Sequence, residues 1–163
     1  MTSPRGRLIR LMLLLSVVAI AGATVGACSQ AGNLVAAGTD PLVTVELRGG
    51  LCQAGPCGAT VFLQRDGHVH SAAKPPNDLG VASAGSMAAL DAAINATDFA
   101  AVKAKQFTGE CPVAFDGQEL VFEFAAPGGT QRIASCEVEI DWGSPLFLAV
   151  AAAMGEWVPL PLT

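Results

Sequence analysis

The two histidines of the chain, His68 and His70, are separated by one valine and have the clearest potential for chemistry. On a β-strand, residues i and i+2 point to the same face, so both imidazoles could reach one metal ion. Asp66 in the adjoining turn could add an oxygen ligand. Val69, however, is the natural inward residue, which leaves both histidines in water, where they are far more often solvated than ligating. We therefore expect no metal site. If the protein does bind a metal ion, His68 and His70 are the candidate ligands.

Other catalytic arrangements have little support in the sequence. A Ser-His-Asp arrangement would have to recruit one of the same two histidines, and no serine lies in a Gly-x-Ser-x-Gly elbow. Carboxylates occur in pairs, Glu119 with Glu123 and Glu137 with Glu139, but they alternate along predicted strands at positions that should face solvent. No glycine-rich phosphate-binding loop opens a helix. We therefore expect a protein that is not an enzyme and that binds no cofactor.

The first residues of the chain have the layout of a secretory signal peptide. Arg5, Arg7 and Arg10 form a basic start, and an almost unbroken apolar run follows over 11–25. The alternative is an uncleaved transmembrane anchor over 11–27, but this stretch is short for a span of about 20 residues. We expect residues 1–27 to be a signal peptide.

The end of the apolar run carries a further signal. Small residues flank a cysteine at Val25-Gly26-Ala27-Cys28. This ending resembles the lipobox of bacterial lipoproteins. The resemblance implies diacylglyceryl transfer to Cys28, cleavage before it, and an exported domain anchored by lipid to the cell membrane or outer membrane.

The chain after the signal is long enough for one compact domain. Residues 28–41, rich in Gly, Ala, Ser and Thr, are expected to form a flexible tether, and residues 42–163 a single domain. All fourteen acidic residues follow Cys28, against six basic ones, so the charge there is about −8. Such a domain has no electrostatic reason to bind nucleic acid, and anionic lipid should repel it. Its membrane contact should come from the lipid on Cys28.

The remaining cysteines are even in number, as expected of an exported protein with disulfides. We favour the pairs Cys52–Cys57 and Cys111–Cys136 among the three possible pairings. The first would close a loop containing Gly55 and Pro56, and the second would join a loop to a strand across one hairpin. A four-cysteine zinc site is the alternative, but its two close cysteine pairs are not found here.

Alternating apolar residues predict strands over 42–48, 60–65, 68–71, 120–124 and 130–140. Gly49-Gly50 should end the first strand, and Asp66-Gly67 should form a hairpin turn. The stretch 73–85 is predicted to be a loop. Helices are expected from the N-cap Ser86 to residue 96 and over 146–154 after Ser144-Pro145, with a short turn at Asp98-Phe99. The order β-β-β-α-β-β-α predicts an α+β fold, in which two helices cover one face of a single antiparallel sheet.

Two surfaces stand out as possible recognition elements. The segment 108–119 places a phenylalanine and a turn beside a cysteine, and a stapled loop is ordered before it binds a partner. The alternative is a purely structural loop. The apolar tail 156–163 either packs back across the domain or offers a small hydrophobic patch.

The motifs of the domain resemble a family of uncharacterised bacterial exported proteins. The resemblance rests on Gly49-Gly50 with Cys52 and Cys57, on Cys111-Pro112 followed by Phe115-Asp116-Gly117, and on Ser135-Cys136 before the Pro145 helix. The order of elements is also similar to that of emfourin-type metalloprotease inhibitors, although those lack cysteines and share only Gly49-Gly50. That likeness implies binding as a function.

Three hypotheses follow from these observations. The first is a lipid-anchored, non-catalytic domain that binds a protein or an envelope component. The second is an anchored protease inhibitor. The third is a metal-binding protein or enzyme that uses His68 and His70. We favour the first, because the export signal is clear and no catalytic arrangement is.

Overall fold

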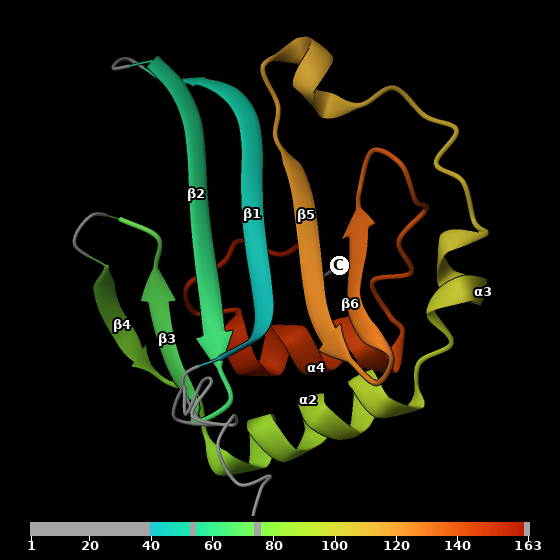
Figure 1. Ribbon diagram of the computed structural model, residues 1–163. Coiled ribbons are helices and arrows are strands. Elements are labelled where there is room, and N and C mark those ends of the chain that lie inside the picture. The colour runs from blue at the N-terminus through green and yellow to red at the C-terminus, as the bar shows by residue number, and fades with distance from the viewer. Residues whose placement is uncertain (1–39, 53–54, 74–75, 162–163) are drawn as a thin grey trace, which may run out of the picture. The chain divides into compact units, whose positions relative to one another are not determined.

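The computed structural model describes residues 40–52, 55–73 and 76–161. These residues form six strands in a single antiparallel sheet with helices packed against it, which confirms the predicted α+β class (Figure 1). The strands are β1 Pro41–Cys52, β2 Gly55–Gln64, β3 His68–Ser71, β4 Asn77–Val81, β5 Glu119–Ala126 and β6 Gly129–Ala134. The helices are α2 Ala84–Ala96, α3 Phe99–Lys103 and α4 Pro145–Met154, with the short 3₁₀ helix η2 Pro112–Phe115.

The strands lie in the order β4-β3-β2-β1-β5-β6. The first strand in the sequence is therefore central, with β2 on one side of it and β5 on the other. The hairpin turn predicted at Asp66-Gly67 joins β2 to β3, and Gly67 has a φ of +92°. Glycine adopts this left-handed conformation at little steric cost, which is why the turn can form there.

Alternation along the strands decides which face of the sheet is buried. On β1, Val43 and Val45 are fully buried, whereas the residues on either side of Val45 are half-exposed. Val43 pairs with Phe124 and Val45 with Phe122 of β5, so four apolar side chains share one face. Full burial of each such side chain contributes about 1.5–3 kcal/mol relative to leaving it exposed. This face is therefore the main source of stability.

Helices α2 and α4 pack on the buried face. In Figure 1, α4 lies behind the sheet and α2 runs across its lower end. The ring of Phe147 in α4 meets Phe122 edge-on, with centroids 5.2 Å apart, the arrangement that aromatic rings favour. Leu90 and Ile94 of α2 are buried in the same core. The polar side of the sheet, by contrast, has no helix over it among the described residues (Figure 1).

The starts of the two long helices follow their capping residues. Helix α2 begins earlier than predicted, because its N-cap is Ser83 rather than Ser86: the Ser86 N–H donates to Ser83 Oγ at 3.0 Å. This bond satisfies one of the free amides of the first turn. Helix α4 begins at Pro145 after Ser144, as predicted, although the Ser144 side chain makes no capping hydrogen bond.

The sequence predicts that the first strand ends at Gly49-Gly50. This prediction is wrong, because β1 continues to Cys52. Both glycines have positive φ, +84° and +83°, and the pairing with β2 shifts register between Arg48 and Leu51. The glycines therefore form a bulge inside the strand, which is a common role for glycine in a strand interior.

The prediction of a loop over 73–85 was also wrong, since this stretch contains β4. The strand pairs with β3, with a register shift between Val69 and His70. Trp157 from the C-terminal tail packs against it, because a Cβ at Gly80 would lie 2.8 Å from Trp157 Cζ2. Val158 is buried in the core, so the tail packs back across the domain. Tertiary contacts of this kind can hold a strand whose own residues favour turns.

The returning strand is shorter than the predicted 130–140. Strand β6 ends at Ala134, and the chain then turns before Val138 forms an isolated bridge with Gln106. The turn predicted at Asp98 is the short helix α3, in which the Ala101 N–H donates to Asp98 Oδ1 at 3.0 Å. The fold thus has one more strand and more helical elements than the predicted order.

Candidate functional site

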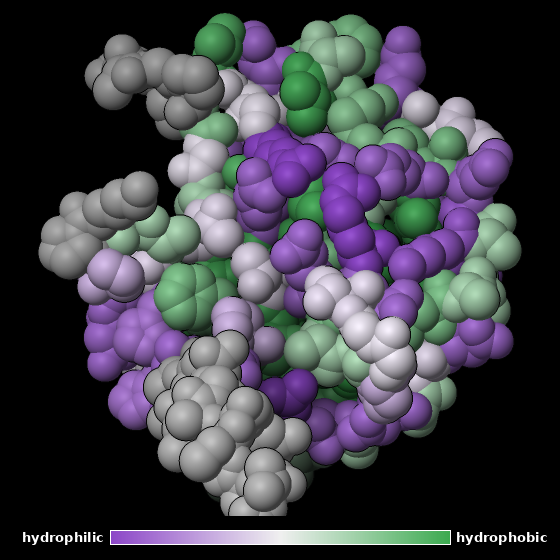
Figure 2. Space-filling model, in the orientation of Figure 1, coloured by the Kyte–Doolittle hydropathy of each residue, from purple (hydrophilic) through white to green (hydrophobic). Residues whose placement is uncertain are grey.

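The helix-free face of the sheet is polar and carries most of the charged side chains of the strands. Figure 2 shows hydrophilic residues gathered over β1, β5 and β6 on this face. Glu123 is exposed, as predicted, and Glu119 is half-exposed. Two arginines of this face contact carboxylates: Arg48 contacts Glu46 at 2.7 Å, and Arg132 contacts Glu137, in the turn after β6, at 2.8 Å. These pairs are partly solvated and add little stability.

The Glu46 carboxylate and the Arg48 guanidinium on this face both have shifted pKa values. The guanidinium of Arg48 donates a hydrogen bond to the carboxylate, and this lowers the pKa of Glu46 more than its slight desolvation raises it. The same bond raises the pKa of Arg48. Glu46 is therefore held as an anion and is a poor candidate for proton transfer.

His68 and His70 lie where the sequence placed them, side by side on the polar face. Their ring centroids are 6.0 Å apart with an interplanar angle of 22°. The His70 ring also stacks on Phe62 of the neighbouring strand β2, with centroids 5.5 Å apart. Val69 between them is fully buried, which confirms the predicted alternation.

The structure adds a carboxylate, that of Asp78, to the two histidines. Asp78 on β4 pairs directly with His70 on β3, so both side chains lie on the same face. Its Oδ2 atom is 3.6 Å from His68 Nδ1. One ligand atom from each of the three side chains lies within 4.8 Å of the others. We name this group, His68, His70 and Asp78, the His-His-Asp cluster.

Asp66, the oxygen donor considered from the sequence, has another role. Its Oδ1 atom accepts a hydrogen bond from the backbone N–H of His68 at 3.1 Å, which closes the β2–β3 turn. Sequence reasoning missed Asp78 because it assigned residues 73–85 to a loop. The available signal was weak: Asp78 is followed by a leucine, a glycine and a valine, which do not alternate as a strand should.

The opposite end of the sheet from the helices carries exposed apolar side chains. Leu51 near the end of β1 is 75% exposed, and Phe115 and Val113 of η2 are 67% and 41% exposed. Helix η2 lies against the glycine bulge of β1, since a Cβ at Gly49 would be 2.9 Å from the Val113 side chain. We name Leu51, Val113 and Phe115 the distal tip. Figure 1 shows η2 above the upper end of β5, next to the end of β1, and Figure 2 shows apolar residues at this upper edge.

The loop that carries η2 is held by a disulfide. Cys111 and Cys136 are bonded, with Cα atoms 5.1 Å apart, and this confirms the predicted pair. Cys136 lies in the turn after β6 rather than on the strand. Asp116 ends η2 in the left-handed region at φ +59°, and Gly117 donates its N–H to Pro112 O at 2.8 Å. The loop over 108–119 is thus held by a disulfide, as predicted, and forms an ordered element at the end of the sheet.

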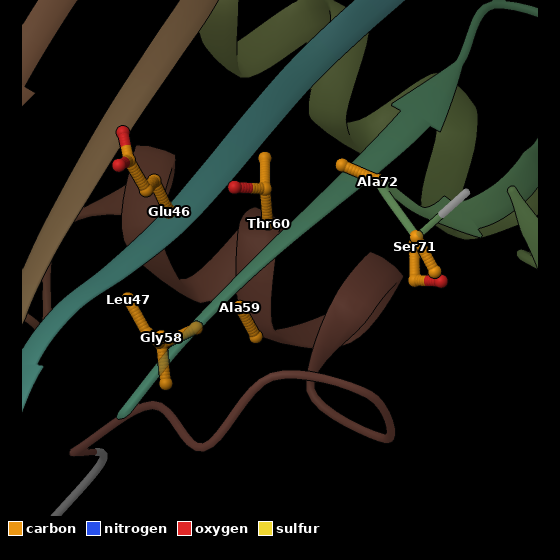
Figure 3. Close-up of a pocket in the computed structure, with 8 residues that line it drawn as sticks. Glu46, Leu47, Gly58, Ala59, Thr60, Ser71 and Ala72 are labelled. Atoms are coloured by element: carbon orange, nitrogen blue, oxygen red, sulfur yellow. The ribbon is translucent and has the colours of Figure 1, made fainter. Parts of the chain in front are cut away.

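A shallow pocket of about 410 Å³ lies where β2 extends past the end of β3. Its lining residues are Glu46, Leu47, Gly58, Ala59, Thr60, Ser71, Ala72 and Ala73. Figure 3 shows Glu46 and Thr60 on the same side of the sheet, as their direct pairing requires. Glu46 is the titratable residue among those lining the pocket, and it is already bonded to Arg48. The pocket therefore offers shape but little reactive chemistry.

Several predicted features lie outside the described residues. These are the signal peptide over 1–27, the lipidated Cys28 and the tether as far as residue 39. Strand β1 begins at Pro41, inside the range predicted for the tether. The pair Cys52–Cys57 stays a prediction, because the Cys52 side chain is outside the described part of the structure.

Among the helices that the structure describes, none combines the length and the hydropathy needed to cross a bilayer. No protein-family model, no curated protein and no solved structure matches the chain.

Proposed function

We propose that the protein is an exported domain, lipid-anchored through Cys28, that performs no catalysis and binds a protein partner or another envelope component through its distal tip. The observation that carries the proposal is the separation between the point where the chain enters the domain and the tip. Asp40 precedes the first residue of β1, and Leu51 lies near the end of the same 12-residue strand. At about 3.3 Å per residue, the two ends of β1 are roughly 35 Å apart. A domain tethered at Asp40 would therefore carry its distal tip roughly 35 Å from the point of attachment, within reach of a partner outside the membrane.

The distal tip has the properties of a small recognition surface. Leu51 and Phe115 are large apolar side chains in contact with water, which soluble domains rarely gather at one place without a binding role. The Cys111–Cys136 disulfide holds the loop before any partner arrives, so binding loses less conformational entropy. We include the predicted Cys52–Cys57 disulfide in this proposal. Cys52 pairs through its backbone with Gly55, so both cysteines lie near the end of the β1–β2 hairpin.

Acyl labelling in cells tests the anchoring. Wild type should incorporate a labelled fatty acid and fractionate with membranes, and Cys28→Ala should do neither. Acyl labelling of the Cys28→Ala protein at the wild-type level would contradict the anchoring.

Site-specific photocrosslinking tests the tip. A crosslinking amino acid at Phe115 should give a discrete adduct in intact cells. The matched control is Leu148, which is 51% exposed on α4 and away from the tip. Adducts of the same mass and yield from both positions, or no adduct from Phe115, would contradict a binding tip. A protease as the adduct would favour the inhibitor hypothesis.

A further inference from the structure

We propose that the His-His-Asp cluster binds one late first-row divalent cation, Cu²⁺ or Zn²⁺, through His68, His70 and Asp78. The proposal does not depend on lipid anchoring or on the distal tip. It begins from the pairing of β3 with β4, which brings two imidazoles and one carboxylate to a single patch of the polar face.

The distances suit ligands of one ion. With metal–ligand bonds of about 2.0–2.1 Å, the ligand atoms of a tetrahedral site lie about 3.3 Å apart. His68 Nδ1 and Asp78 Oδ2 are 3.6 Å apart, and one ligand atom of His70 lies within 4.8 Å of both. Small rotations of these partly exposed side chains would bring all three atoms to bonding distance.

An ion pair between His68 and Asp78 is the simpler explanation, but it accounts for less of the geometry. At 3.6 Å, the Nδ1–Oδ2 distance is longer than a hydrogen bond between these groups. An ion pair also does not involve the adjacent His70. A shared cation accounts for all three side chains.

Neighbouring groups hold the three ligands in place, as the outer contacts of metal sites generally do. The Asp78 Oδ1 atom accepts a hydrogen bond from the Gly80 N–H at 3.1 Å, which leaves Oδ2 facing His68. The His70 ring is stacked on Phe62. Strand β4 itself rests on Trp157, whose ring leaves room for no side chain at Gly80.

The donor set indicates the class of ion. Imidazole nitrogens favour copper, zinc and nickel, whereas Mg²⁺ and Ca²⁺ favour oxygen ligands alone. The side chains of His68 and Asp78 are 43% and 58% exposed, so water can fill the remaining positions of an ion there. The general order of affinities places Cu²⁺ above Zn²⁺.

Calorimetric titration of the full-length protein at pH 7.5 with Cu²⁺ and, separately, Zn²⁺ tests the site. Wild type should bind one equivalent of each ion, with Cu²⁺ the tighter, and a large excess of Mg²⁺ should not compete. His68→Gln/His70→Gln should abolish this binding. Asp78→Asn, which keeps the shape but removes the charge, should weaken it by about tenfold or more.

Asp66→Asn is the matched control, since its carboxylate is on the same hairpin but bonds a backbone amide. It should leave the affinity within about twofold of wild type. Thermal melts of each variant without metal show whether it remains folded. If the double histidine variant melts at a lower temperature than wild type, the single variant His70→Gln replaces it in the titration. The proposal is overturned if wild type binds no equivalent of either ion, if binding survives in the double histidine variant, or if Asp66→Asn and Asp78→Asn weaken it equally.

Discussion

Removing the disulfide between Cys111 and Cys136 should destabilise the domain mainly by freeing its unfolded chain. The bridge joins residues 25 apart in the sequence, and loop-closure entropy for a loop of this length corresponds to about 3.5 kcal/mol at 25 °C. For a domain of this size, such a loss should lower Tm by more than about 10 °C. The double variant Cys111→Ala/Cys136→Ala tests this prediction, because it removes the bridge and leaves neither of its two cysteines as a free thiol.

Urea unfolding followed by tryptophan fluorescence measures this loss. The free energy of unfolding should decrease by about 3.5 kcal/mol, and the m value should increase because the unfolded chain without the bridge exposes more surface. The near-ultraviolet circular dichroism of the folded variant should stay close to that of wild type.

The predicted Cys52–Cys57 bridge is the internal comparison. It would close a loop of only a few residues, for which the same entropy argument gives about 2 kcal/mol. The Cys52→Ala/Cys57→Ala variant should therefore lose less than the Cys111→Ala/Cys136→Ala variant. A larger loss from the short loop, or a loss below about 1 kcal/mol from the long one with an unchanged m value, would refute the loop-closure reasoning.

Three further changes test separate parts of the structure. Gly49→Ala should lower the free energy of unfolding in urea by about 1–3 kcal/mol more than Gly128→Ala. Both glycines have positive φ, but only a Cβ at Gly49 would meet a neighbouring side chain, that of Val113 at 2.9 Å. Equal losses from the two variants would contradict this packing. Phe147→Ala should lower the free energy of unfolding by about 3–5 kcal/mol in the same melts, because the side chain is 1% exposed in the aromatic core. A loss below about 1 kcal/mol would contradict the burial of this side chain. The hydrogen bond from Arg48 lowers the pKa of Glu46, so this bond stabilises the fold above the usual carboxyl pKa of about 4.5 and is lost as the pH falls through the lower folded value. Glu46→Gln should therefore lose less stability on acidification than wild type, a small difference because the pair is exposed, and identical acid titrations would argue against the bond.

Much of the sheet could be predicted from local pattern. Alternating apolar residues located strands β1, β2, β3 and β5, because burial of one face imposes a period of two on each. Asp66-Gly67 located a hairpin and Ser144-Pro145 a helix start, because these residues suit those backbone conformations by themselves. Such features depend on a few neighbouring residues, and they were predicted correctly.

Features that depend on distant contacts could not be predicted. Strand β4 exists where Asn77 and Gly80 favour a turn, because β3 pairs with it on one side and Trp157 packs against it. The glycine bulge of β1 looked like a strand end, since nothing in the sequence showed that Val113 would approach Gly49. The missing strand also hid the third member of the His-His-Asp cluster. Both errors concern elements whose stability comes from another part of the chain.

In a domain anchored as we propose, tension would be carried by β1. This central strand begins beside Asp40, where a tether would pull, and ends near the distal tip, where a partner would hold. It pairs with β5 from Val43 to Arg48 and with β2 over most of its length. Antiparallel hydrogen bonds run perpendicular to the strands, so a force along β1 shears both ladders at once instead of opening bonds one after another. Such a domain should keep its fold while it is stretched between a membrane and whatever it binds.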